Sequence, residues 1–172
     1  DQSKNQKGLG YYMTGPGPGT EIARGTLLQG KRGLIMGVAN NRSIAWGIAQ
    51  AAHREGARLA VTYQGERLEE NVRALAQALR DPLVLPCDVA KDSDLESLAA
   101  SLREGMGGLD FVVHAVAFAL REELDGAFVN TSREGYRIAQ DISSYSLTAL
   151  ARQAAPLMEG GGGIVTLSYL GG

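Results

Sequence analysis

The chain has 172 residues, which is enough for one domain with a sizeable buried core. Its 17 lysines and arginines against 19 acidic residues give a formal charge of -2 without a basic stripe, which argues against nucleic acid as a partner. The single cysteine, Cys87, excludes an internal disulfide and fits a reducing cytoplasm. We expect neither a signal peptide nor a membrane span, because no apolar run approaches the ~20 residues that a bilayer requires.

Residues 1–26 are predicted to form a flexible extension outside the fold. Their Gly-Pro run, residues 15–19, cannot propagate a helix or a strand. Residues 27–172 are predicted to form one dinucleotide-binding domain, because apolar runs and helical patterns alternate from there onward.

The first unit of the domain is an apolar run, residues 34–36, that ends on Gly37. After a polar loop and Ser43, apolar residues recur at helical spacing, at Ile44, Ile48, Ala51 and Ala52. A buried strand, a glycine turn and a helix whose free amides face the strand's carboxyl end form an anion site. The pyrophosphate of a dinucleotide would lie there.

The spacing in this loop differs from the usual G-x-G-x-x-G fingerprint. We expect Gly37 to provide the tight turn and Gly47 the close contact between helix and strand. The hydroxyl of Ser43 could reach a phosphate oxygen or simply cap the helix, and the loop alone leaves both interpretations open.

The remaining elements continue the alternation of strand and helix. The predicted strands are 58–63, 83–89, 109–116 and 164–169, and the predicted helices are 66–80, from Asp92 or Ser93 as cap to about 105, and 133–158. Pro86 requires an end or edge position for the third strand. The long irregular stretch 117–131 is typical of a functional loop. The pattern predicts an α/β fold, a Rossmann-type doubly wound parallel sheet of order 3-2-1-4-5, with the ligand crevice between strands 1 and 4.

The candidate site residues follow the carboxyl ends of predicted strands, where this architecture binds ligands. Gln64 stands where an acidic residue normally holds the adenosine ribose. Its amide can bind a hydroxyl but does not repel a 2′-phosphate, and Arg67 is near, so the residues leave NADH and NADPH open. Asp88 and Val89 could receive the adenine, although an Asp after a strand also commonly forms a turn.

Three further residues have chemistry that could matter. Tyr169, at the end of the fifth strand, could hydrogen-bond a substrate carbonyl or pack under a loop. His114 is interpreted as a hydrogen-bonded core histidine, because no triad pattern accompanies it. Cys87 is interpreted as a small buried apolar residue. We find no metal-ligand cluster, and the pair Glu122-Glu123 is interpreted as solvent-facing charge.

Six segments of the domain resemble the enoyl-acyl-carrier-protein reductases of bacterial fatty-acid synthesis, a divergent branch of the short-chain dehydrogenase/reductase superfamily. These segments are GVANNRSIAWGIA (37–49), TYQ (62–64), CDV (87–89), DFVVHAVAFA (110–119), DISSYS (141–146) and IVTLSYLG (164–171). Ordinary members of the superfamily would instead show T-G-x-x-x-G-x-G in the first loop, N-N-A-G after strand 4 and a serine after strand 5.

The resemblance implies a cofactor role for several matched positions. Gly37, Ser43 and Ile44 would hold the pyrophosphate end, Gln64 the adenosine ribose, and the pair Asp88-Val89 the adenine. A glutamine at the strand-2 position is similar to family members that use NADH.

The resemblance also implies the substrate side of the site and the activity. Val116 would lie against the cofactor, Ala119 near the acyl substrate, and Tyr169 would be the first of two active-site tyrosines. The family reduces the trans-2 double bond of enoyl thioesters of acyl carrier protein with NADH. Its members are generally cytoplasmic homotetramers.

The chain departs from the family pattern after Tyr169. The second tyrosine and the lysine of the catalytic helix, and the strands beyond it, should follow, but the sequence stops at Gly172. We therefore expect the cofactor half of a longer reductase, inactive by itself. The alternatives are a 3-ketoacyl or other short-chain carbonyl reductase, and a non-catalytic dinucleotide-binding fragment.

Overall fold

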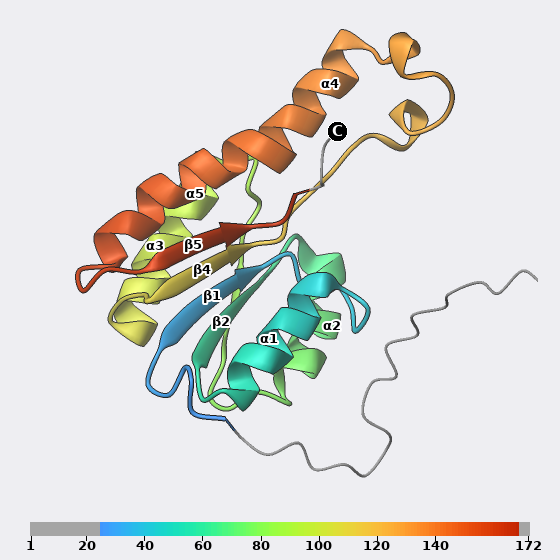
Figure 1. Ribbon diagram of the computed structural model, residues 1–172. Coiled ribbons are helices and arrows are strands. Elements are labelled where there is room, and N and C mark those ends of the chain that lie inside the picture. Colours follow the sequence, from blue (N-terminus) through green and yellow to red (C-terminus); the bar gives the residue numbers. More distant parts are fainter. Residues whose placement is uncertain (1–24, 169–172) are drawn as a thin grey trace, which may run out of the picture.

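The computed structural model describes residues 25–168, which form a parallel sheet with helices on both faces (Figure 1). The strands and helices, in chain order, are β1 (Arg32–Met36), α1 (Ile44–Arg54), β2 (Arg58–Tyr63), α2 (Glu66–Ala76), β3 (Leu83–Pro86), α3 (Asp92–Met106), β4 (Phe111–His114), α4 (Arg133–Gln140), α5 (Ser146–Ala154) and β5 (Gly163–Thr166). Single 3-10 turns occur at Arg121–Glu123, Phe128–Asn130 and Ala155–Leu157, and a π-helical turn at Asp141–Tyr145. The predicted extension 1–26 falls almost wholly outside the described residues, and so does Tyr169.

The sheet has the order β3-β2-β1-β4-β5, and all its neighbouring strands are parallel. The predicted order is therefore confirmed. Because the chain moves outward from β1 first on one side and then on the other, the connections diverge between β1 and β4 and leave a crevice at their carboxyl ends. Pro86 is the last residue of the edge strand β3, where its missing N–H costs no ladder bond.

The sheet separates two hydrophobic cores, and successive residues of β1 belong to different ones. Leu34 and Met36 are buried with residues of α3 and α5. Ile35 is buried with residues of α1 and α2. This arrangement follows from the pleat, which points neighbouring side chains to opposite faces. It explains why the central strands are almost continuously apolar.

The buried face of α1 differs in part from the predicted one: Ala52 is buried and Ile48 packs against the core, but Ile44 does not. Ala45, Trp46, Ala49 and Ala52 are buried, whereas Ile44 is 69 % exposed. Both sets of residues have helical spacing, so periodicity could not choose between them. The small alanines allow the helix to pack close to the sheet, and that gain outweighs burial of the larger Ile44 side chain.

Several element ends also differ from the predictions. The fourth strand covers four of the eight predicted residues, and α2 ends at Ala76 rather than at 80. The expected cap of α3 by Asp92 or Ser93 is wrong, because Lys91 occupies the N-cap without a side-chain bond. The predicted helix 133–158 is helical from Arg133 to Leu157, but it changes pitch at the π-helical turn.

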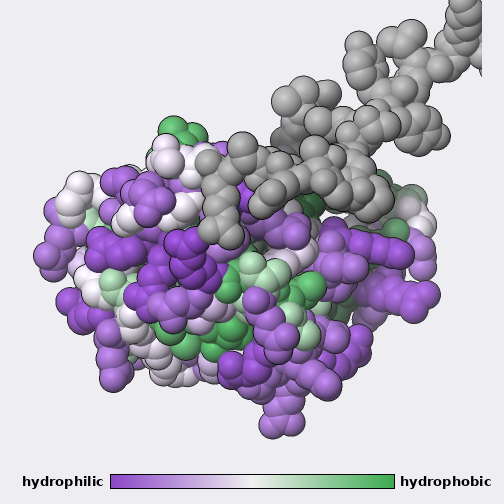
Figure 2. All heavy atoms as spheres, turned by 90° about the horizontal axis from the view of Figure 1, so that it is seen from below, coloured by the Kyte–Doolittle hydropathy of each residue, from purple (hydrophilic) through white to green (hydrophobic). Residues whose placement is uncertain are grey.

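Figure 2, which views the molecule from below, shows hydrophilic residues over most of that face and a group of hydrophobic residues near its centre. None of the helices formed by residues 25–168 has the length and hydrophobicity needed to cross a membrane.

Candidate functional site

A cavity of ≈ 240 Å³ opens at the carboxyl ends of four strands, β1 to β4. The residues that line it are Met36, Gly37, Val38, Ala39, Thr62, Tyr63, Gln64, Leu68, Cys87, Val89, Ala115, Val116, Ala117, Phe118 and Ile142. The structure thus brings four predicted site residues together around one space: Gly37, Gln64, Val89 and Val116.

Gly37 forms the bend at which β1 turns into the loop. Its φ is +95°, a conformation that side chains disfavour, and a Cβ at this position would lie 2.0 Å from the carbonyl oxygen of Ala115. The predicted tight turn at Gly37 is confirmed. The backbone of β1 and the end of β4 approach each other here because residue 37 has no side chain.

Ser43 closes the loop rather than capping α1 through its side chain. Its Oγ accepts hydrogen bonds from the amides of Ala39 (3.1 Å) and Asn40 (3.0 Å), and α1 has no side-chain cap bond. The first turn of α1 contains no acidic residue. Its leading amides and the positive end of the helix dipole are therefore suited to an anion.

Gly47 does not make the predicted contact between helix and strand. It is exposed in the first turn of α1, and a Cβ there would meet no atom within 4 Å. The reason is that α1 turns a different face to the sheet than the sequence predicted: Ala45 and Ala49 face the sheet instead of Gly47.

Four predicted site residues do not line the cavity, namely Ser43, Ile44, Asp88 and Ala119. Ser43 and Ile44 lie at the start of α1, next to the lining residues of the loop. Asp88 lies between the lining residues Cys87 and Val89. Ala119 directly follows the lining residue Phe118.

Asp88 orients the side chain of Gln64. Its Oδ1 accepts from Gln64 Nε2 at 3.2 Å and from the amide of Ala90 at 3.1 Å, while Oδ2 lies 3.5 Å from Lys91 Nζ. An ionised carboxylate only accepts, so the amide nitrogen of Gln64 must face Asp88, and Gln64 Oε1 is left to accept a hydrogen bond from a ligand.

Cys87 and His114 behave as the sequence indicated. Burial, together with the charges of Asp94 and Asp88, raises the pKa of the Cys87 thiol to about 12, so the thiol stays protonated and inert. His114 is 1 % exposed and hydrogen-bonds Thr166 and Ser146. Burial lowers the pKa of His114, which keeps its ring neutral near pH 7.

Glu123 lies at the surface, as predicted, and in addition it holds two chain segments together. Its carboxylate accepts from the amide of Ser132 at 2.9 Å and from the Ser132 hydroxyl, which itself caps α4 at Gly135. These bonds to Ser132 lower the pKa of Glu123. Glu123 thereby fastens the loop 117–131 to the start of α4.

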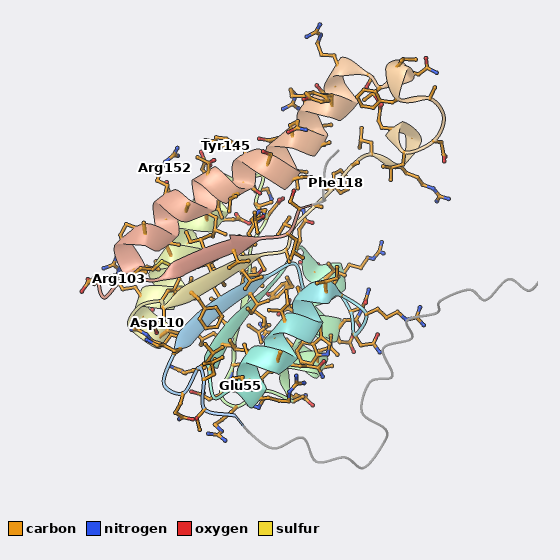
Figure 3. All side chains as sticks on the ribbon, in the orientation of Figure 1. Glu55, Arg103, Asp110, Phe118, Tyr145 and Arg152 are labelled. Carbon is orange, nitrogen blue, oxygen red and sulfur yellow. The ribbon has the colours of Figure 1, made fainter. Side chains whose placement is uncertain are left out.

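The sequence analysis missed several residues of the cavity, of which Phe118 and Ile142 are the most informative. Phe118 follows β4, and Ile142 belongs to the π-helical turn. Figure 3 shows Phe118 near that turn, at the end of the sheet opposite to Asp110. Both residues lie in segments that resemble the family, 110–119 and 141–146, and this position could have indicated that they belong to the site.

The strand order, the glycine turn, the open helix start and the crevice at the carboxyl edge together define a Rossmann-type fold, which is the fold of the short-chain dehydrogenase/reductase class. Within that class, residues 37–172 match the sequence profile described as Enoyl-(Acyl carrier protein) reductase, and the chain belongs to this family. The resemblance of the six segments is confirmed at this level.

Known proteins of this family are similar to the chain over most of its length. The NADH-dependent enoyl-acyl-carrier-protein reductase FabI of Bacillus cereus is 54 % identical over 148 residues, which are 85 % of this chain and 58 % of that protein. A Bacillus cereus crystal structure with NADP+ and indole naphthyridinone has a TM-score of 0.82 at 53 % identity and covers 84 % of this chain and 57 % of that one.

The crystal structure of the Anaplasma phagocytophilum reductase in complex with NAD has a TM-score of 0.81 at 46 % identity, covering 84 % of this chain and 55 % of that one. The chain therefore spans a little over half the length of the relatives that it matches.

Proposed function

We propose that the whole protein to which this chain belongs reduces the trans-2 double bond of enoyl thioesters of acyl carrier protein with NADH. The observation that supports this proposal most directly is the cavity at the carboxyl ends of β1 and β4, bordered by Gly37, in a chain of the enoyl reductase family. The residues fit a dinucleotide, because the positive φ of Gly37 and its contact with the Ala115 carbonyl let β1 bend sharply at the edge of the cavity, next to the leading amides of α1.

The pyrophosphate end would be held at the start of α1. The leading amides of the helix would face the phosphates, and Gly37 would allow the backbone to approach them. The Ser43 oxygen already accepts two amide bonds, so its own proton is available to donate to a phosphate oxygen. Ile44 is exposed next to Ser43 and would cover the pyrophosphate end of the cofactor.

The adenosine end would lie near Gln64, Asp88 and Val89. Gln64 Oε1 is an acceptor, which suits the 2′-hydroxyl of NADH and offers nothing to the oxygens of a 2′-phosphate. The charge of Asp88 would also repel such a phosphate. This arrangement supports NADH over NADPH, although Arg67, two residues into α2, remains exposed. Val89 would provide an apolar surface for the adenine.

The reacting end would lie against Val116, Phe118 and Ile142. When bound, NADH supplies the hydride that reduces C3 of the enoyl group, and a proton completes C2. The three apolar side chains would exclude water from this end of the cavity, which strengthens the stabilisation of the enolate oxygen. Ala119 would lie near the acyl chain, and Tyr169 would contribute a phenol to the substrate.

The partner protein, the assembly and the location that we propose are based on the family. The partner would be the acyl carrier protein that delivers the thioester, and the assembly would be a homotetramer. A cytoplasmic location agrees with the protonated, buried state of Cys87, the single cysteine.

Binding can be tested on this chain alone. Trp46 is the single tryptophan and lies buried in the first turn of α1, which would hold the pyrophosphate. Addition of NADH should quench its fluorescence and sensitise nicotinamide emission, with weaker effects from NADPH. The absence of both changes at saturating NADH would count against a nucleotide site here.

Activity is tested on the whole protein. A crotonyl thioester should cause oxidation of NADH, and a 3-ketoacyl thioester should not. A preference for the ketoacyl substrate would favour the carbonyl-reductase alternative, and nucleotide binding without oxidation of either substrate would favour a non-catalytic module.

A further inference from the structure

The helical segment between Arg133 and Leu157 has a shifted backbone hydrogen bond at its π-helical turn. The amide of Ser146 bonds to the carbonyl of Asp141, five residues back. In an α-helix it would bond to Ile142 instead. The amide of Ser146 is therefore not the donor to the carbonyl of Ile142.

Ser146 donates to that carbonyl through its side chain. Its Oγ lies 2.6 Å from the carbonyl oxygen of Ile142 and 2.7 Å from His114 Nε2. A hydroxyl has one proton and a carbonyl can only accept, so Ser146 donates to Ile142 and accepts from His114 Nε2–H. His114 Nδ1 is then an acceptor, and the Thr166 hydroxyl, 3.1 Å away, can donate to it. The same hydroxyl lies 3.3 Å from the His114 carbonyl oxygen, which also accepts from the amide of Leu167.

The hydrogen bond between His114 and Ser146 is buried and connects two elements. Ser146 is 0 % and His114 1 % exposed, so neither can exchange its partner for water. The bond joins the last residue of β4 to the π-helical turn, and it fixes the tautomer of the histidine.

The π-helical turn also forms one wall of the cavity. Ile142 lines the cavity directly. Ser143 Oγ accepts from the amide of Phe118 at 3.0 Å and donates to the carbonyl of the same residue at 3.1 Å. Figure 3 shows Phe118 near this turn, with Tyr145 on the outer side of the helix.

We propose that Ser146 and His114 are positioning residues: they hold the π-helical turn so that Ile142 and Phe118 form the wall beside the reacting end of the cofactor and the acyl chain. The catalytic meaning of this wall rests on the proposed function. The link between Ser146 and the wall does not, and it can be tested separately.

The first experiment measures hydrogen exchange on this chain. Ser146→Ala should raise the exchange of peptides covering 115–120 and 141–147 roughly tenfold, as expected for the loss of one buried hydrogen bond, while β1 and β2 stay unchanged. Ser144→Ala is the matched control, since Ser144 is an exposed serine of the same turn. Unchanged exchange in both peptides, or an equal rise throughout the sheet, would overturn the proposal.

A second pair of variants distinguishes the loss of this hydrogen bond from general misfolding. His114→Gln retains an N–H that can reach Ser146, whereas His114→Leu removes it. His114→Leu should reproduce the local exchange of Ser146→Ala, and His114→Gln should show less of it. Equal exchange in the two His114 variants would contradict the assigned role of the Nε2–H.

The last experiment separates positioning from binding in the whole protein. Ser146→Ala should raise KM for the enoyl thioester and lower kcat, together by roughly 10- to 100-fold in kcat/KM, with less than about a twofold change in the Kd of NADH. Kinetic constants equal to those of Ser144→Ala would overturn the positioning role. A wild-type protein that does not oxidise NADH would instead refute the proposed function and leave the exchange result intact.

Discussion

Gly37 and Gly47 stand close together in the sequence, and their surroundings differ completely. Gly37 adopts a φ of +95° against the carbonyl of Ala115. Gly47 lies on the open side of α1 with no neighbour for a Cβ. The same substitution should therefore have opposite effects at the two positions.

Gly37→Ala should lower the free energy of unfolding by about 1–3 kcal/mol for the strained backbone alone, and it should abolish nucleotide binding. Gly47→Ala should raise the free energy of unfolding by up to ~1 kcal/mol, because alanine is the better helix former. Denaturant titration followed by Trp46 fluorescence measures both. Equal effects of the two substitutions would show that the backbone at Gly37 is not constrained as described.

Asp110 is a second residue with a defined prediction. Its carboxylate accepts from the amide of Arg32 at 2.8 Å and from Arg32 Nε at 3.0 Å, with Lys31 at 3.9 Å. The Arg32 guanidinium holds the pKa of Asp110 below its ordinary value. Because the pKa is depressed in the folded state, the stabilisation is complete above the unfolded pKa of about 3.9 and is lost as the pH falls through the folded pKa.

Asp110→Asn should therefore be less stable than wild type near neutral pH, and the difference should shrink below pH ~4. Urea titrations across this pH range measure the difference. A difference that stays constant down to acid pH would mean that the charge of Asp110 contributes nothing to folding.

Among the elements, α1 is packed through its alanines. Ala49 is 0 % exposed, and Ala45 and Ala52 lie on the same face. No space remains there for a larger side chain, because the close approach of helix and sheet depends on these methyl groups.

Ala49→Leu should lower the free energy of unfolding by about 1–3 kcal/mol through overpacking. Its neighbour Gln50 is exposed, and Gln50→Leu should change the free energy of unfolding by less than about 0.5 kcal/mol. Thermal or urea unfolding of the two variants gives the comparison. A neutral Ala49→Leu would indicate that α1 can move away from β1 and β2.

The type and order of the elements could be predicted from local patterns, whereas contacts between elements could not. Apolar runs and helical spacing suffice to identify five strands and the crevice between β1 and β4. The predicted set Ile44, Ile48, Ala51 and Ala52 is as helical in its spacing as the buried set Ala45, Trp46, Ala49 and Ala52, so the buried face of α1 depends on the sheet beneath it.

In the site, too, local patterns could predict single residues but not the contacts between elements. Gly37 and Gln64 could be identified from their places after strands, because every strand of this architecture ends at the same edge. The π-helical turn could not be predicted, because hydrogen bonds to the fourth or to the fifth preceding residue give side-chain patterns that differ little over one turn. Nor could the bond between His114 and Ser146, which joins residues far apart in the sequence.

For the molecule as a whole, nucleotide binding and folding should be coupled, since the cavity is built from residues at the carboxyl ends of four strands, β1 to β4. NADH at a hundred times its Kd should raise the free energy of unfolding by about 2.7 kcal/mol. Urea titrations with and without NADH measure this shift, and Gly37→Ala should remove it. A shift of the same size in Gly37→Ala would place the binding elsewhere.

The division of β1 between two cores has a consequence for how this chain can change in evolution. Leu34 and Met36 face one layer and Ile35 the other. One extra codon within β1 would send each side chain downstream of it to the wrong layer and dislodge the Gly37 bend as well. Inserted residues are therefore expected to accumulate in the exposed stretch 124–130, which does not line the cavity, and to be absent from Arg32–Met36.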